Sequence, residues 1–119
     1  MLLAIIPFAQ AHDLTTLEIT QLPRFCWGQF VQGAKAPEFN IPAGCGVAMN
    51  HYCYGLVDLA RGKRTYGNIK ERITRFKLAK VNIVYTINSM ANFPACPIRA
   101  HVENALTEVN GLLMGLGQK

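Results

Sequence analysis

The spacing of apolar residues after position 44 is the feature that most limits the folds open to this chain. In that part of the sequence apolar side chains recur at steps of three and four, which places them on one face of an α-helix. No stretch alternates apolar and polar residues for more than a few positions, as a half-buried strand would. The sequence therefore predicts an all-α fold, with helices over 45–63, over 66–91 and from Pro97 onward.

Each predicted helix has its own apolar stripe. The first consists of Met49, Tyr52, Cys53, Leu56, Leu59 and Ala60, the second of Ile69, Ile73, Phe76, Ile83, Ile87 and Met90, and the third of Ile98, Val102, Ala105, Leu106, Val109, Leu112, Leu113 and Leu116. In the second stripe Lys80 stands between Phe76 and Ile83. Its amine must therefore reach open water or a carboxylate.

Short links determine how these helices are arranged. The segments 64–66 and 92–97 favour antiparallel neighbours. We expect an antiparallel helical hairpin plus a third helix over 45–119, similar to a fragment of an α-solenoid. Residues 12–44 are expected to form an N-terminal segment, with a short helix or turn interrupted at Pro23 and then a loop rich in Gly and Pro. A chain of 119 residues fits one domain.

Four cysteines in so short a chain indicate an oxidising compartment and two disulfides. They include no CxxC motif, which argues against a closed zinc site. In the antiparallel arrangement Cys45 and Cys96 lie at the same end of the helices, so we predict that they bond to each other. Cys26 then pairs with Cys53 by elimination and tethers the N-terminal segment to the first helix. Free buried thiols are the alternative.

The first eleven residues, MLLAIIPFAQA, are apolar and end in a small-x-small pattern that signal peptidases accept. We predict a signal peptide cleaved after Ala11, although no Lys or Arg precedes the apolar run. An N-terminal core strand or helix is the alternative. Together with the cysteines, this segment predicts a periplasmic or extracellular protein. No apolar run reaches the ~18 residues of a membrane span.

The net charge of +5 is concentrated in one part of the chain, where only Glu71 opposes the cations. This basic stripe consists of Arg61, Lys63, Arg64, Lys70, Arg72, Arg75, Lys77 and Lys80. Such a stripe can meet phosphates, an acidic partner or anionic lipid, or it can be a solvated helix face. Its cations are spread around the helix with few aromatic residues between them, so we do not expect a nucleic-acid partner.

Two short motifs connect the chain to a known family. One is Leu22-Pro23-Arg24-Phe25-Cys26-Trp27, and the other is MNHYCYGLVDLARG, which begins at Met49. Together they resemble the N-terminal region of exported proteobacterial tetratricopeptide-repeat proteins, which carry a Leu-Pro-x-x-Cys segment and then a helix opening His-Tyr-Cys-x-Gly-Leu. The resemblance covers roughly residues 22 to 116 in layout. It implies a helical-hairpin fold, export and a Cys26–Cys53 bond, but no binding site or activity, and the family's later repeats do not occur within these residues.

Residues that could carry chemistry are few. The seven carboxylates contain no evident acid–base pair, and no phosphate-binding glycine loop or GxSxG motif occurs, so we predict no enzyme and no cofactor. His51 and Cys53 lie two apart on a helix and face different sides, which keeps them from sharing a metal ion. A weak alternative is copper, because cleavage after Ala11 would leave His12 as an N-terminal chelate that His51 or His101 could complete.

The apolar stripe of the third helix predicts a contact with another chain. A layer of three helices cannot cover both of its faces, so we expect apolar residues of this helix to contact another chain. The residues expected there are Leu106, Val109, Leu112, Leu113 and Leu116. The leading hypothesis is an exported, non-enzymatic structural or interaction protein that self-associates, through a head-to-tail contact that can build a filament. The alternatives are a periplasmic carrier of copper or another ligand, and a basic accessory subunit of a membrane-associated complex that retains residues 1–11 as an anchor.

Overall fold

The computed structural model describes residues 13–46, 49–65 and 67–119. Within these ranges every regular element is a helix and no residue forms a strand, so the all-α prediction is confirmed. The α-helices are α2 (Thr16–Gln21), α3 (Asn50–Arg64), α4 (Ile69–Ser89) and α5 (Arg99–Gly115), and the short 3-10 helices are η1 (Arg24–Gln29), η2 (Pro37–Phe39), η3 (Ala43–Cys45) and η5 (Met90–Asn92). The predicted signal segment 1–11 and His12 lie outside the described residues.

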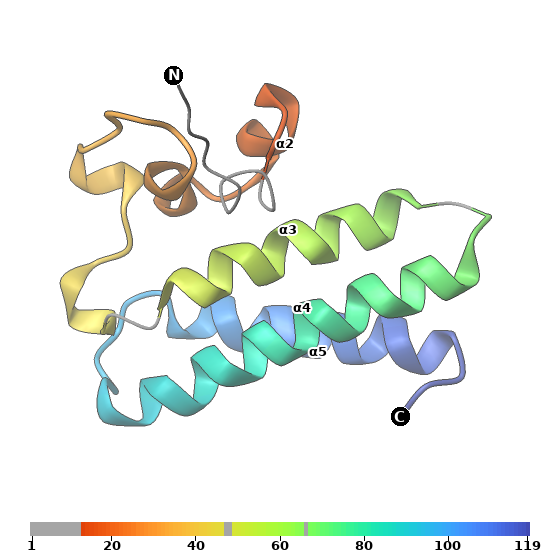
Figure 1. Cartoon of the computed structure of the whole chain (residues 1–119). Helices are drawn as coiled ribbons and strands as arrows, with labels where there is room; N and C mark the ends of the chain where they lie inside the picture. The colour runs from red at the N-terminus through yellow and green to blue at the C-terminus, as the bar shows by residue number, and fades with distance from the viewer. Residues whose placement is uncertain (1–12, 47–48, 66) are drawn as a thin grey trace, which may run out of the picture.

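The three long helices form the predicted hairpin with a third helix beside it. α3 and α4 run antiparallel, and α5 returns behind them (Figure 1). α4 packs extensively against both α3 and α5, whereas α3 and α5 touch each other much less. The N-terminal segment lies over α3, on the side away from α4 (Figure 1). α4 is therefore the central helix of the layer, and α3 lies between α4 and the N-terminal segment.

α3 begins five residues later than the apolar spacing predicts. The helix starts at Asn50, because Cys45 ends the 3-10 helix η3 and does not open an α-helix. Directly after it, Gly46 takes a φ of +91°, a left-handed conformation that costs glycine little. A chain in that conformation cannot be part of a right-handed helix, so the predicted start at Cys45 is wrong.

The two later helices also begin inside their predicted ranges. α4 starts at Ile69 because Asn68 caps it, its side-chain oxygen accepting a hydrogen bond of 3.0 Å from the backbone nitrogen of Glu71. α5 starts at Arg99, so Pro97 lies before the helix and does not occupy its first turn. At α5 the apolar spacing, which begins with Ile98, continues into a turn whose backbone is not helical.

Two glycines of α3 allow the close contact with α4. A Cβ atom on Gly62 would lie 2.6 Å from the ring of Phe76, and one on Gly55 would lie 3.2 Å from the carbonyl oxygen of Ala79. Because neither position has a side chain, the two helices approach closely at these points. Phe76, Ala79 and Ile83 are completely buried in the resulting contact.

The buried stripe of α4 is rotated from the predicted one. Ala79, and not Lys80, occupies the core between Phe76 and Ile83, and Thr86 is also fully buried, its hydroxyl donating to the carbonyl oxygen of Asn82 over 2.9 Å. Since α4 packs against helices on two sides, its buried residues follow two adjoining rows of the helix surface. Ile69, predicted to lie in the stripe, is the first residue of α4 and is 60% exposed.

Both predicted disulfides are present. Cys26 bonds to Cys53, with Cα atoms 5.6 Å apart, and Cys45 bonds to Cys96, with Cα atoms 4.6 Å apart. The bonds close loops with sequence separations of 27 and 51, and each is expected to contribute about 2–4 kcal/mol to stability. They indicate an oxidising environment outside the cytoplasm. Among the described residues, no helix is long and apolar enough to cross a bilayer.

The N-terminal segment has local order of its own. Thr15 and Glu18 form a capping box at the start of α2, each accepting a hydrogen bond from the other's backbone nitrogen. The indole nitrogen of Trp27 donates to the carbonyl oxygen of Leu22, and its ring stacks on Phe39 at 5.5 Å between centroids. These contacts hold a short chain segment in one position over α3, and the Cys26–Cys53 bond fixes it there.

Candidate interaction surface

The structure divides the predicted basic stripe into paired and unpaired cations. Arg61 and Arg64 of α3 both reach Glu18 of α2, Lys63 reaches Glu108 of α5, and Arg75 of α4 reaches Asp58 of α3 and Glu71 of its own helix. Lys70, Arg72, Lys77 and Lys80 form no ion pair within the described ranges. The stripe is therefore not one continuous cationic surface, because half of its members are neutralised by acids from other elements.

Glu18 is the centre of the largest ion-pair cluster. Its Oε2 accepts from Arg61 Nε at 2.8 Å and from Arg64 Nη2 at 2.6 Å, and its side chain is only 15% exposed. The hydrogen bond from Arg61 is the main reason that the pKa of Glu18 falls from 4.5 to about 2, against the opposing effect of burial. The cluster is structural, since it joins the capped first turn of α2 to the last turn of α3.

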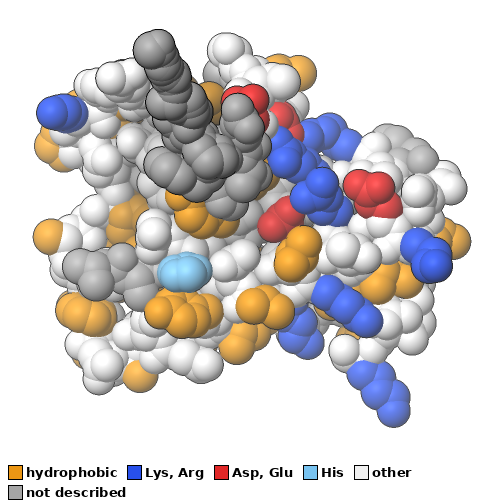
Figure 2. All heavy atoms as spheres, in the orientation of Figure 1, with side chains coloured by type: hydrophobic (Ala, Val, Ile, Leu, Met, Phe, Trp, Pro, Cys, Tyr) orange, Lys and Arg blue, Asp and Glu red, His pale blue; other side chains and the backbone are white. Residues whose placement is uncertain are grey.

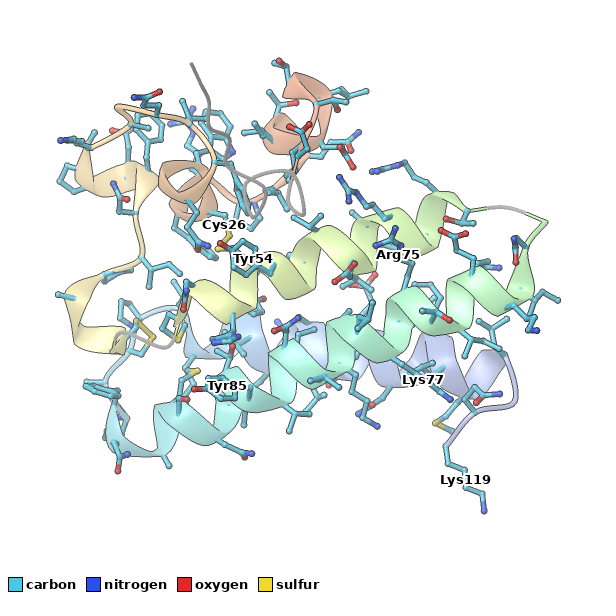
Figure 3. All side chains as sticks on the ribbon, viewed as in Figure 1. Cys26, Tyr54, Arg75, Lys77, Tyr85 and Lys119 are labelled. Carbon is cyan, nitrogen blue, oxygen red and sulfur yellow. A yellow bond between two sulfur atoms is a disulfide. The ribbon has the colours of Figure 1, made fainter. Side chains whose placement is uncertain are left out.

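The cross-helix pairs of Lys63 and Arg75 have the same role. Lys63 Nζ lies 2.6 Å from Glu108 Oε2, which links α3 to α5, and Arg75 Nη1 lies 2.9 Å from Asp58 Oδ1, which links α4 to α3. Figure 3 shows Arg75 extending from α4 toward α3. These cations are committed to contacts inside the chain.

The predicted apolar interface on the third helix is mostly core. Val109 is fully buried and Leu113 is 2% exposed, while Leu106, Leu112 and Leu116 are half-buried and pack against the core. The stripe of α5 faces its own neighbours because α4 lies against it along most of its length. Met114, which was not in the predicted set, is the most exposed large apolar residue of α5, at 71%.

The exposed apolar surface lies instead on α4. Leu78, Val81 and Tyr85 are 45%, 66% and 49% exposed. They follow each other at steps of three and four, so they form a second stripe on the solvent-facing side of α4. The steps of three and four between these residues are visible in the sequence. The same helix also carries the row 76, 83, 87 and 90 at similar steps, so the sequence alone does not show that α4 has two apolar sides and not one.

A groove lies where this second stripe meets the C-terminal end of α5. It has a volume of about 530 Å³ and is lined by Lys77, Lys80, Val81, Val84, Tyr85, Asn88, Leu113 and Lys119. We refer to it as the α4–α5 groove. Its middle is apolar, and three lysines lie on its rim. Figure 3 places Tyr85 toward one end of α4, and Lys77 and Lys119 toward the other.

The three rim lysines are part of the unpaired charge of the molecule. Six of the twelve Lys and Arg residues form ion pairs, namely Arg24, Arg61, Lys63, Arg64, Arg75 and Arg99, and six of the seven carboxylates are their partners. Lys77, Lys80 and Lys119 form no ion pair in the part of the chain that is described. In the lower right of Figure 2, over α4, cationic side chains lie beside hydrophobic ones with no acidic group among them. The groove is therefore both apolar and positively charged.

Tyr85 is held in place by α3. Its ring lies 4.2 Å from the ring of His51, measured between centroids, and His51 Nδ1 lies 3.2 Å from Asn82 Oδ1, one turn earlier on α4. The Tyr85 side chain is thus supported on one side and half exposed on the other. A supported aromatic side chain loses little conformational entropy when a partner covers it.

The second histidine cluster lies away from the groove, between α3 and α5. The hydroxyl of buried Tyr52 lies within hydrogen-bond distance of His101 Nδ1 and donates to the carbonyl oxygen of His101 over 3.0 Å. Burial raises the pKa of Tyr52 and lowers that of His101, so both side chains are neutral at pH 7. This contact joins α3 to α5 and uses the polar atoms of both side chains.

The residues considered for metal binding are not gathered at one point. Within the described ranges, no three His, Cys, Asp or Glu side chains are close enough together to hold an ion. His51 and His101 contact different partners, Asn82 and Tyr52. His12, on which the copper alternative depends, lies outside the described residues.

Comparisons with known proteins add no family assignment. No family model, no curated protein and no solved structure matches this chain.

Proposed function

We propose that this is an exported, non-enzymatic interaction protein that holds another protein chain against the α4–α5 groove. The observation that carries the proposal is the exposed second stripe of α4, in which Val81 is 66% and Tyr85 is 49% exposed beside three unpaired lysines. A contiguous apolar patch with a polar rim is typical of a protein contact site. The disulfides support export, and periplasmic or extracellular location is part of the proposal.

The proposal includes the relationship to exported tetratricopeptide-repeat proteins. The antiparallel pair α3–α4 and the Cys26–Cys53 bond support it, because both features agree with what the resemblance implies. In this interpretation the N-terminal segment and the two disulfides stabilise the layer, and the surface that remains open on α4 performs the function.

A capture experiment with matched variants tests the proposal. Val81 and Leu17 are equally exposed, at 66%, but Leu17 lies on α2, away from the groove. Immobilised wild-type protein and the Leu17→Asp variant should retain the same protein from the non-cytoplasmic fraction of the source organism, and Val81→Asp should lose it. Quantitative mass spectrometry of the bound fractions measures this. If all three proteins retain the same set, or none, the groove is not the interface.

Self-association into a head-to-tail oligomer or filament is the second candidate. Exposed apolar side chains on different elements favour it, since Leu17 of α2 and Met114 of α5 are 66% and 71% exposed. A contact between such unlike surfaces is heterologous, and it builds an open filament when the rotation between copies does not close a ring. Light scattering during size-exclusion chromatography should then show mass rising with concentration, and electron microscopy should show filaments. A monomeric mass at every concentration would rule out self-association.

A further inference from the structure

The shape of the α4–α5 groove limits what can occupy it. Its lining residues on α4 extend from Lys77 to Asn88, about 16 Å along the helix axis, or three turns. Leu113 contributes from α5, so the groove follows two roughly antiparallel helices. A third helix lying along such a groove can place side chains spaced at i, i+3 or i+4, and i+7 on its floor.

The groove is too open to enclose a small molecule. A site for a small ligand usually buries most of the ligand's surface. Here Val81 and Tyr85 remain about half to two-thirds exposed, which means that the side of the groove facing solvent has no wall. A macromolecular partner supplies that wall itself, and the apolar middle then becomes the dry core of an interface.

The charge of the groove limits the partner further. Lys77, Lys80 and Lys119 form no ion pair among the described residues, so a charged group that covers them must pair with them or repel them. A second copy meeting this groove with its own groove would place lysines against lysines, which is unfavourable. Because six of the seven carboxylates of the chain are already paired, the remaining surface of a second copy offers little free negative charge.

We propose that the α4–α5 groove binds an acidic amphipathic helix of another protein. This inference rests on the proposed function and specifies the partner. The apolar face of the partner helix lies on Val81 and Val84, and Tyr85, already positioned by His51, forms the aromatic contact at one end. Asp or Glu residues of the partner pair with Lys77 and the other rim lysines, so the acidic residues gather toward one end of its apolar stripe (Figure 3).

Three synthetic helical peptides of about 18 residues provide the probe. Each has leucines at steps of three and four, with Glu, Gln or Lys at the polar positions near one end. Binding is measured by fluorescence anisotropy at physiological salt with the disulfide-bonded full-length protein. The Glu peptide should bind most tightly, the Gln peptide more weakly, and the Lys peptide not measurably.

Variants locate the binding. Val81→Asp and the pair Lys77→Glu with Lys80→Glu should each weaken the Glu peptide by about tenfold or more. Lys35→Glu changes the charge at an exposed lysine outside the groove and should leave the affinity unchanged. Thermal melts with unchanged midpoints would show that the variants are folded. Equal binding of the Glu peptide to all variants, or equal binding of the three peptides, would overturn the proposal.

Two further outcomes would rule out an acidic helix and identify another occupant of the groove. If no peptide binds and Val81→Asp abolishes self-association in light scattering, the occupant is a second copy. If no peptide binds and Val81→Asp abolishes binding to vesicles of phosphatidylcholine and phosphatidylglycerol, the occupant is an anionic membrane. If the protein binds none of these probes, the acidic-helix proposal is wrong, and the capture experiment with Val81→Asp decides separately whether the groove binds another protein.

Discussion

α3 and α4 are neighbouring helices with similar apolar spacing, but they are covered to very different extents. α3 is enclosed on three sides, since Cys53 bonds to the N-terminal segment, Gly55 lies against α4 and Tyr52 contacts His101 of α5. α4 is enclosed on the sides that hold Phe76 and Ile83, while its opposite side is open to solvent. The N-terminal segment covers the outer side of α3, whereas no described residue covers the outer side of α4 in the same way.

The charges differ in the same way. Every cation of α3 is paired, Arg61 and Arg64 with Glu18 and Lys63 with Glu108. Of the five cations on α4, only Arg75 is in an ion pair among the described residues. A helix whose charges are paired and whose faces are buried contributes to folding, whereas solvated charge beside exposed apolar area contributes little to folding and remains available to a partner. The comparison therefore supports a structural role for α3 and the proposed recognition role for the outer side of α4.

The largest effect is expected from the two sides of α4. Ile83→Ala removes a fully buried side chain and should lower the free energy of unfolding by about 2–5 kcal/mol. Val81→Ala, two positions away on the exposed side, should change it by less than about 0.5 kcal/mol. Chemical denaturation measures both. Similar losses in the two variants would mean that the outer side of α4 is also packed, and the comparison would fail.

The sequence was sufficient for the parts of the fold that depend on spacing and on chain geometry. The helix order follows from apolar steps of three and four, and the Cys45–Cys96 bond follows from two short links that bring these cysteines to the same end. The starts of α3 and α4 could not be predicted in this way, because they depend on the positive φ of Gly46 and on the cap formed by Asn68. Both are local backbone features to which apolar spacing is insensitive.

The candidate site was only partly predictable. Lys77 and Lys80 belong to the predicted basic stripe and do line the groove, but Arg61 and Glu18 are 43 residues apart, and nothing local in the sequence indicates that they pair. The apolar stripe of the third helix is the longest, and for that reason the sequence predicts the exposed apolar surface there. A long stripe shows that a face is buried, but it does not show whether the chain itself or a partner buries it.

The next largest effect is expected at the ion-pair cluster that joins the N-terminal segment to α3. Glu18→Gln removes the carboxylate that pairs with Arg61 and Arg64, and should cost about 3 kcal/mol of unfolding free energy at pH 7. The pKa of Glu18 is about 2 in the folded chain against 4.5 ordinarily, so this stabilisation is complete above pH 4.5 and is lost as the pH falls toward 2. The difference between wild type and variant should therefore disappear over that interval in denaturation curves.

Glu38→Gln is the matched control for Glu18. Glu38 pairs with Arg24, but the two side chains are 57% and 69% exposed, so water screens the pair. We expect a change below about 0.5 kcal/mol. If the two variants lose equal stability, the Glu18 cluster does not fasten the N-terminal segment, and α3 is less enclosed than the comparison requires.

The smallest effect tests the contact that both helices share. Gly62→Ala adds a Cβ atom 2.6 Å from the ring of Phe76, which is fully buried and has no room to move. The clash should outweigh the better helix propensity of alanine, for a net loss of about 1 kcal/mol. Gly111→Ala on α5 places the same atom in open space and should stabilise by about 0.5–1 kcal/mol. Opposite shifts in thermal midpoint would establish that α3 and α4 approach closely at Gly62, whereas stabilisation by both variants would show that the hairpin is looser and that the two helices differ less than their contacts indicate.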